Sequence, residues 1–104
     1  MIDPRIAPAA KGDLAWDGAN YLVAWTDSRS GTNNDIYGAR VSAAGMVQDA
    51  AGIALAASAA NEGSPAVASG SAGRVALAYE RSPSQFSVAS QIMLRFFDAG
   101  GRSL

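Results

Sequence analysis

A polar loop between two apolar strands holds the residues best placed to do chemistry. The loop reads DSRSGTNND, and its carboxylate and amide oxygens come from Asp27, Asn33, Asn34 and Asp35. Oxygen ligands around a central glycine suit a calcium ion, but Arg29 stands where calcium loops place an oxygen ligand. We therefore favour a structural role, in which Asp27 and Asp35 accept hydrogen bonds from loop amides or from Arg29 and fix the connection.

Aromatic side chains are a second candidate for recognition, since an exposed ring can stack on a sugar or a peptide. The tryptophans and tyrosines are Trp16, Trp25, Tyr21, Tyr37 and Tyr79. Trp25 and Tyr79 hold equivalent places in two similar segments, which predicts that both lie in a core between sheets. Trp16 and Tyr37 lie beside turns and stay candidates for exposure. The candidate ligand-binding residues are therefore Trp16, Tyr37, Asp27, Arg29 and Asp35.

Composition argues against most catalytic chemistry. Cysteine and histidine are absent, which removes thiol and imidazole catalysis, disulfides and the usual zinc sites. Among the nine carboxylates, an acid/base pair of the glycosidase kind could be nominated at Asp13 and Asp17 or at Glu62 and Glu80. No local context marks either pair, the serines lack a G-x-S-x-G setting, and the glycine-rich spots do not form a phosphate loop. We expect no enzyme, no cofactor and no metal site.

The charge balance and the hydropathy pattern limit the partners. The net charge is −1 and the charges are scattered, which disfavours binding to nucleic acid or to an anionic membrane. No apolar run approaches the ~20 residues of a membrane-spanning helix, and the N-terminus has no signal-peptide core. At 104 residues the chain suits a single domain, 1–104, with a modest core.

The elements that position the polar loop are predicted to form a β-hairpin. Asp17–Asn20 carries turn chemistry, and Tyr21–Thr26 follows it, rich in aromatic and branched side chains. Asp35–Val41 is the return strand. The first strand is apolar on both faces, with larger side chains on one face, so we expect it to be covered on both sides. A two-stranded ribbon alone is marginal in water, which predicts further strands around it.

Flanking segments are predicted to supply those strands. Gly12–Trp16 is a brief strand before the turn, Ile53–Ala56 is a short outer strand, and the proline-punctuated residues 2–10 suit an edge strand or an extended lead-in. Ala50–Ala60 is rich in alanine, but a glycine interrupts it and it lacks a 3.6-residue apolar stripe, so we expect no helix there. Asn61–Ser64 is predicted to be a turn.

A weaker copy of the hairpin follows about fifty residues later. Pro65–Ser69 matches the approach strand, and Val75–Glu80 keeps the alternation of large and small side chains. Residues 81–90 form the second loop, and Gln91–Phe97 forms the second return strand. Repetition of strands and turns at this period is typical of propeller blades or of another stacked β array.

The register of the second return strand stays open by one residue. One alternative matches Ile36 with Ile92, which places Arg40 opposite Phe96. The other alternative places Arg40 opposite Arg95. The sequence does not decide between them.

The first copy resembles a known repeat. The run from Asp17 to Tyr37, DGANYLVAWTDSRSGTNNDIY, is similar to the WD-like β-propeller repeat of the TolB family and of many large exported bacterial proteins. In that repeat an Asp-Gly turn precedes an apolar strand, a Ser/Thr-Asp-x-Arg-x-Gly loop and an Asp-Ile-Tyr strand start. The second copy is degenerate, with Ser71-Ala72, Glu80-Arg81 and Gln91-Ile92-Met93 at the corresponding points.

The resemblance implies an all-β fold of two propeller-type blades with about four antiparallel strands each, blade 1 at about 8–60 and blade 2 at about 65–104. Because a closed propeller takes roughly 4–8 blades, the chain would need neighbouring blades of a longer chain or further copies of itself. Residues 2–7 could supply the outer strand of blade 2, and three copies would make a six-bladed ring. The resemblance also suggests a periplasmic or extracellular location.

The resemblance does not select a reaction, because such propellers serve as docking platforms, ligand-binding modules and accessory domains. Our leading expectation is a non-catalytic module for binding or self-assembly, acting through open blade edges and exposed apolar faces. Two alternatives remain: an accessory propeller segment of a secreted hydrolase, and a small oligomeric lectin that binds sugar between blades.

Overall fold

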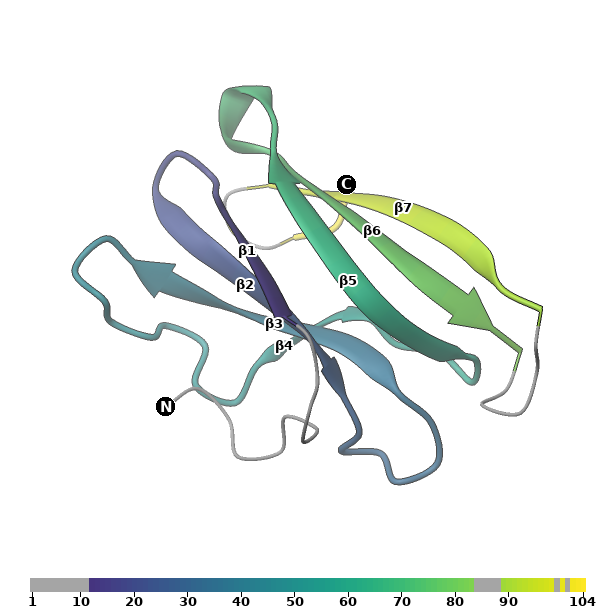
Figure 1. Ribbon diagram of the computed structural model, residues 1–104. Coiled ribbons are helices and arrows are strands. Elements are labelled where there is room, and N and C mark those ends of the chain that lie inside the picture. The colour runs from purple at the N-terminus through teal and green to yellow at the C-terminus, as the bar shows by residue number, and fades with distance from the viewer. Residues whose placement is uncertain (1–11, 84–88, 99, 101) are drawn as a thin grey trace.

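Two antiparallel sheets make up the described part of the protein, residues 12–83, 89–98, 100 and 102–104 of a computed structural model (Figure 1). Sheet A has the strand order β1-β2-β3-β4 and sheet B the order β5-β6-β7. The strands are β1 (Gly12–Trp16), β2 (Asn20–Asp27), β3 (Asp35–Ser42), β4 (Ile53–Ala56), β5 (Asn61–Ser69), β6 (Val75–Ser82) and β7 (Gln91–Phe97). Within the described residues the one helical segment is a 3₁₀ turn, η1 (Ser71–Gly73). The expected all-β class is confirmed.

The turn before β2 is fixed by Asp17. Its Oδ1 accepts hydrogen bonds from the backbone N–H groups of Ala19 and Asn20, at 2.8 and 2.7 Å. Gly18 takes a φ of 100°, a conformation that residues with a Cβ rarely adopt. From this turn, β2 pairs with β3 without a break, residues 20–27 lying opposite residues 35–42.

The alanine-rich segment forms a strand and not a helix, as expected. β4 pairs with β3, with a register shift between Ile36 and Tyr37. Leu55 of β4 lies over Gly38 of β3, where an added Cβ would come within 2.7 Å of the Leu55 Cδ1. Because Gly38 leaves a gap that Leu55 fills, packing against β3 overrides the helix propensity of the alanines.

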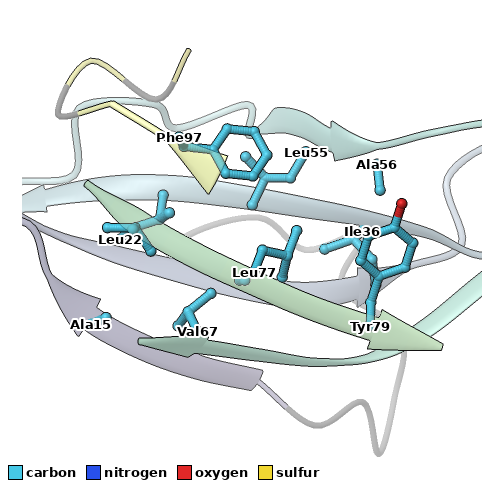
Figure 2. Packing of buried hydrophobic residues seen from close by; sticks show 11 residues of the cluster. Ala15, Leu22, Ile36, Leu55, Ala56, Val67, Leu77, Tyr79 and Phe97 are labelled. Carbon is cyan, nitrogen blue, oxygen red and sulfur yellow. The ribbon is translucent and has the colours of Figure 1, made fainter. Parts of the chain in front are cut away.

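The core lies between the facing sides of the two sheets (Figure 2). Sheet A contributes Ala15, Leu22, Ala24, Ile36, Leu55 and Ala56, and sheet B contributes Val67, Val75, Leu77, Tyr79 and Phe97. The β1 and β2 side chains of this core are mostly small, whereas sheet B supplies two aromatic rings, so the surfaces interlock by size. Arg95 of β7 crosses the interface, where its Nη1 donates to the Leu55 carbonyl at 3.0 Å.

Strand pairing settles the register that the sequence leaves open. The strands β1–β3 and β5–β7 follow the same antiparallel order, and Trp25 pairs with Tyr37 as Tyr79 pairs with Met93. Counting back one residue from Tyr37 and from Met93 matches Ile36 with Ile92. This is the first of the two registers, in which Arg40 lies opposite Phe96 and not Arg95.

One local expectation is wrong. Asn61–Ser64 is not a turn, because β5 begins at Asn61 and its first residues pair with the end of β6. The register of this pairing shifts between Gly63 and Ala66, and Ser64 has a φ of 52°. The turn-forming residues therefore make a β-bulge inside a strand instead of reversing the chain.

Sheet A has the four strands expected of it, and sheet B has three strands in the described part of the chain. The outer edge of β7 carries the isolated bridge Phe97↔Ser103, at the edge that β4 occupies on β3. The strand or lead-in expected in residues 2–10, and the pairing of residues 2–7 with the second unit, lie outside the described residues. No helix in the part of the chain that the structure describes has the length and apolar character to cross a membrane.

Candidate functional site

Asp27, at the end of β2, is buried and fully engaged in hydrogen bonds. Trp25 Nε1 donates to its Oδ2 at 2.8 Å, and the backbone N–H of Arg29 donates to its Oδ1 at 2.9 Å. The Arg29 guanidinium adds a two-pronged pair, Nε to Oδ1 and Nη2 to Oδ2, both at 2.8 Å. Burial alone would raise the pKa of Asp27, but the bonds from Arg29 and Trp25 outweigh it and hold the pKa below its ordinary value. The carboxylate is therefore ionised and joins strand to loop.

Arg29 extends this cluster to β3 and to the turn before β4. Its guanidinium carbon lies 3.8 Å from the centroid of the Tyr37 ring, and its Nη1 donates to the Ala51 carbonyl at 2.7 Å. Gly52 lies against Trp25, since a Cβ at Gly52 would be 3.2 Å from the Trp25 Cζ2. Tyr37 is thus half-buried beneath a guanidinium, so its ring face is already occupied.

The loop asparagines tie the loop to the start of sheet B. Asn33 Nδ2 donates to the carbonyls of Ser58 and Ala60 at 2.8 and 2.7 Å. The backbone N–H of Asn34 donates to the Asn61 Oδ1 at 2.8 Å. The loop borders a hollow of about 190 Å³. In the described part of the chain, no group of three or more His, Cys, Asp or Glu side chains comes together in a way that could hold a metal ion.

Asp35 and Glu62 form a buried acidic pair that the sequence reasoning missed. Glu62 is 1% exposed, and its Oε2 accepts a hydrogen bond from the Ser58 hydroxyl at 2.8 Å. Its Oε1 has no hydrogen-bond partner among the described residues. Burial raises the pKa of Glu62, the Ser58 bond opposes this, and the neighbouring Asp35 raises the pKa further. The pair meets only because β3 and β5 come together, which no local spacing in the sequence reveals.

The acid pairs nominated from the sequence do not come together as acid/base pairs. Glu62 lies opposite Arg81 and Glu80 lies opposite Gly63, so the two glutamates point to opposite faces of sheet B. Asp13 Oδ2 accepts a hydrogen bond from the backbone N–H of Val67 at 2.9 Å, which links β1 to β5. The Asp17 carboxylate already accepts a hydrogen bond from the backbone N–H of Ala19 within its own turn.

Trp16 is the aromatic candidate that reaches the surface. It is 40% exposed and packs edge-on against Tyr21, with ring centroids 4.9 Å apart. Leu14 lies on the same face of sheet A, because it pairs with Val23 in the alternation that carries Trp16 and Tyr21. We call Leu14, Trp16 and Tyr21 the β1–β2 cluster. It is an exposed apolar surface at one end of the outer face of sheet A.

A second exposed apolar surface lies on β7. Ile92, Leu94 and Phe96 are 73%, 59% and 48% exposed. They alternate along one strand, so all three share the face of sheet B that points away from sheet A, while Phe97 points into the core. We call these residues the β7 stripe. The alternation is visible in the sequence, but the sequence does not show that the more apolar face is the exposed one. The covered face carries Gln91 and Arg95 beside the apolar Met93 and Phe97.

Comparison with known proteins gives no relative to place beside this chain. No family model matches it, no curated protein matches it, and no solved structure matches it.

Proposed function

We propose that the chain is a non-catalytic module of the β-propeller repeat type, which works by packing the outer faces of its sheets against further β-sheets. Those sheets belong to other copies of the chain or to neighbouring blades. The β7 stripe carries this proposal. Large apolar side chains set in a row on a sheet face are unusual on a monomer surface and mark an interaction site.

The packing inside the chain supports the same proposal. Ile36 on the inner face of sheet A is fully buried by sheet B, while its counterpart Ile92 is exposed. Sheet B thus presents to its surroundings the kind of surface that sheet A buries. The similarity of Asp17–Tyr37 to the propeller repeat fits this arrangement, as does the shared strand order of the two sheets. A location outside the cytoplasm is part of the same proposal.

The non-catalytic part of the proposal rests on how the polar side chains are used. Asp17 holds a turn, Asp27 holds Arg29 and Trp25, and Asp13 links the two sheets. Each of these carboxylates accepts short hydrogen bonds from the backbone or from a neighbouring side chain. A catalytic acid or base needs a proton that it can exchange with a substrate, which such framework bonds do not offer.

Light scattering across a concentration series tests the proposed function. Association through the sheet faces predicts a mass above that of the 10.6 kDa chain, falling on dilution. Replacing Ile92 and Leu94 by serine is expected to lower the mass, while Met46→Ser, at a residue that is also exposed but outside both sheets, leaves it unchanged. A strict monomer at every concentration, together with no binding to an isolated β-propeller blade, would contradict the proposal.

A sugar-binding role is the second candidate, and the exposed Trp16–Tyr21 pair is the observation that favours it. Aromatic rings at a surface can stack on the apolar face of a pyranose. A glycan array tests this role: binding to a defined class of sugar that is lost in Trp16→Ala and kept in Tyr37→Phe would support it. Uniform absence of binding removes this candidate and leaves the packing module.

A further inference from the structure

We infer that the partner of the β7 stripe is a second copy of this chain, bound head to tail, so that the outer face of sheet A of one copy covers the outer face of sheet B of the next. The inference rests on the proposed function and specifies which surface meets which. The contact between sheets A and B within one chain shows how it is made.

The outer face of sheet B corresponds to the inner face of sheet A. Strand pairing matches Ala15, Leu22, Ala24 and Ile36 of sheet A with Ala68, Ala76, Ala78 and Ile92 of sheet B. The first set is buried by sheet B within the chain. The second set keeps small side chains on β5 and β6 and an isoleucine on the third strand. The surface that receives a partner sheet inside the chain is therefore present again on the outside.

The outer face of sheet A corresponds to the inner face of sheet B. The same pairing matches Val67, Val75, Leu77 and Tyr79 of sheet B with Leu14, Tyr21, Val23 and Trp25 of sheet A. The first set fills the core, and the second set keeps large side chains at each place. Trp25 is already covered, so the open part of this face is the β1–β2 cluster with the half-buried Val23 beside it.

The receiving faces also differ at some places, such as Arg40 on sheet A and Phe96 on sheet B, and one of these differences has a direct physical explanation. Sheet A has Gly38 on β3, and Leu55 from β4 fills the space above it. Sheet B has Leu94 at the matching place and no fourth strand among the described residues. Leu94 supplies from β7 the apolar bulk that Leu55 supplies from β4. The receiving surface is thus kept although its outer strand is not.

Size complementarity favours a head-to-tail contact over a symmetric one. Two outer faces of sheet A would set the bulky β1–β2 cluster against itself, whereas the alanines of β5 and β6 offer it room. Each chain carries one receiving face and one inserting face, so the contact is heterologous and a dimer formed this way still has one free face of each kind. Assembly therefore continues beyond the dimer, into a ring if the rotation between copies closes and into an open filament if it does not.

Two charge-bearing variants test the inference by complementation. One variant, Ile92→Glu with Leu94→Glu, blocks the receiving face; the other, Leu14→Glu with Tyr21→Glu, blocks the inserting face. All four side chains are exposed, so each variant should keep the native β-sheet circular dichroism and melting behaviour of a monomer. Met46→Glu is the matched control for an added charge at an exposed apolar site. Each blocked variant alone is expected to self-associate about a hundredfold more weakly than the native chain, since a carboxylate buried at the contact lacks a partner.

An equimolar mixture of the two variants should give a species of about twice the mass of one chain that does not grow further, because only one intact pair of faces remains. A symmetric contact through the β7 stripe predicts instead that the Leu14→Glu, Tyr21→Glu variant still self-associates. Mixing it with the other variant would then form no additional dimer. This result would overturn the inference and leave the proposed function standing. A native chain that stays monomeric at every concentration overturns the inference, and it leaves the proposed function only with packing against neighbouring blades.

Discussion

Ile36 and Ile92 hold matching places in β3 and β7, yet Ile36 is fully buried and Ile92 is 73% exposed. The difference arises from what covers each sheet. Sheet B covers the inner face of sheet A, and in the described part of the chain no third sheet covers the outer face of sheet B. The same residue type at the same place in two sheets therefore has two different energetic roles.

Replacing each isoleucine by alanine separates these roles. Ile36→Ala should lower the free energy of unfolding by about 2–5 kcal/mol, because it leaves a cavity between the sheets. Ile92→Ala should change it by less than about 0.5 kcal/mol, because the side chain gains little from folding of the monomer. Urea denaturation at a concentration where the chain is monomeric measures both values. Equal losses in the two variants would show that sheet B is covered in the isolated chain.

Gly38→Ala tests the packing of β4 on β3. The new Cβ would lie 2.7 Å from the Leu55 Cδ1 and 2.8 Å from the Val23 carbonyl oxygen, so we expect a loss of about 1–3 kcal/mol from overpacking. Leu55→Ala alone should also destabilise the chain, by leaving a cavity. The double variant should lose less stability than the sum of the two single losses, because shortening Leu55 makes room for the new Cβ. Strict additivity in this thermodynamic cycle would contradict the contact.

Asp27→Asn tests the cluster at the end of β2. The variant loses the charge that pairs with Arg29, and we expect a loss of about 2–3 kcal/mol near neutral pH. Because the pKa of Asp27 is lowered on folding, its contribution is present above its ordinary value of 3.8 and is lost as the pH falls through the lowered value. Denaturation curves between pH 2 and 7 should therefore converge for the native chain and the variant at the acid end. A constant gap down to the lowest pH would exclude ionisation of Asp27 as the cause.

Glu62→Gln should have the opposite pH dependence. The pKa of Glu62 is raised on folding, so its contribution is fully present below its ordinary value of 4.5 and is lost as the pH rises through the raised value. The glutamine variant stays neutral and should be more stable than the native chain by about 1 kcal/mol near pH 8, with little difference near pH 4. Asp98→Asn, at a half-buried acid whose pKa is lowered, should show the opposite trend with pH and serves as the contrasting variant. Greater stability of the glutamine variant at pH 4 than at pH 8 would refute the assignment.

Local chemistry was enough to predict most strands from the sequence. Ile53–Ala56 and Gln91–Phe97 were predicted with the bounds that the structure has, because each is a run of strand formers between turn residues. The failure at Asn61–Ser64 has a clear reason. Its residues have the backbone freedom of a turn, but pairing with β6 uses that freedom for a bulge.

The candidate site was less predictable because it depends on how sheets meet. The contact of Asp27 with Arg29 is local. The hydrogen bonds to Asp27 that the sequence analysis favoured over a calcium site are present. The proximity of Asp35 to Glu62 requires β3 to lie beside β5, a contact between distant segments. Likewise, Trp16 and Tyr37 both lie beside turns, and only the position of Arg29 shows which ring is left accessible.

Sheet B carries Leu94 at the place where sheet A carries Gly38, and this difference limits which strand could be added beside β7. A fourth strand could add to the edge of β7 through backbone bonds, but a leucine on it could not occupy the place that Leu55 takes beside β3, because the Leu94 side chain already stands there. We therefore expect a segment that docks along that edge to carry a small residue at this point. The side chain at position 94 would therefore favour some added strands over others according to the volume of one residue.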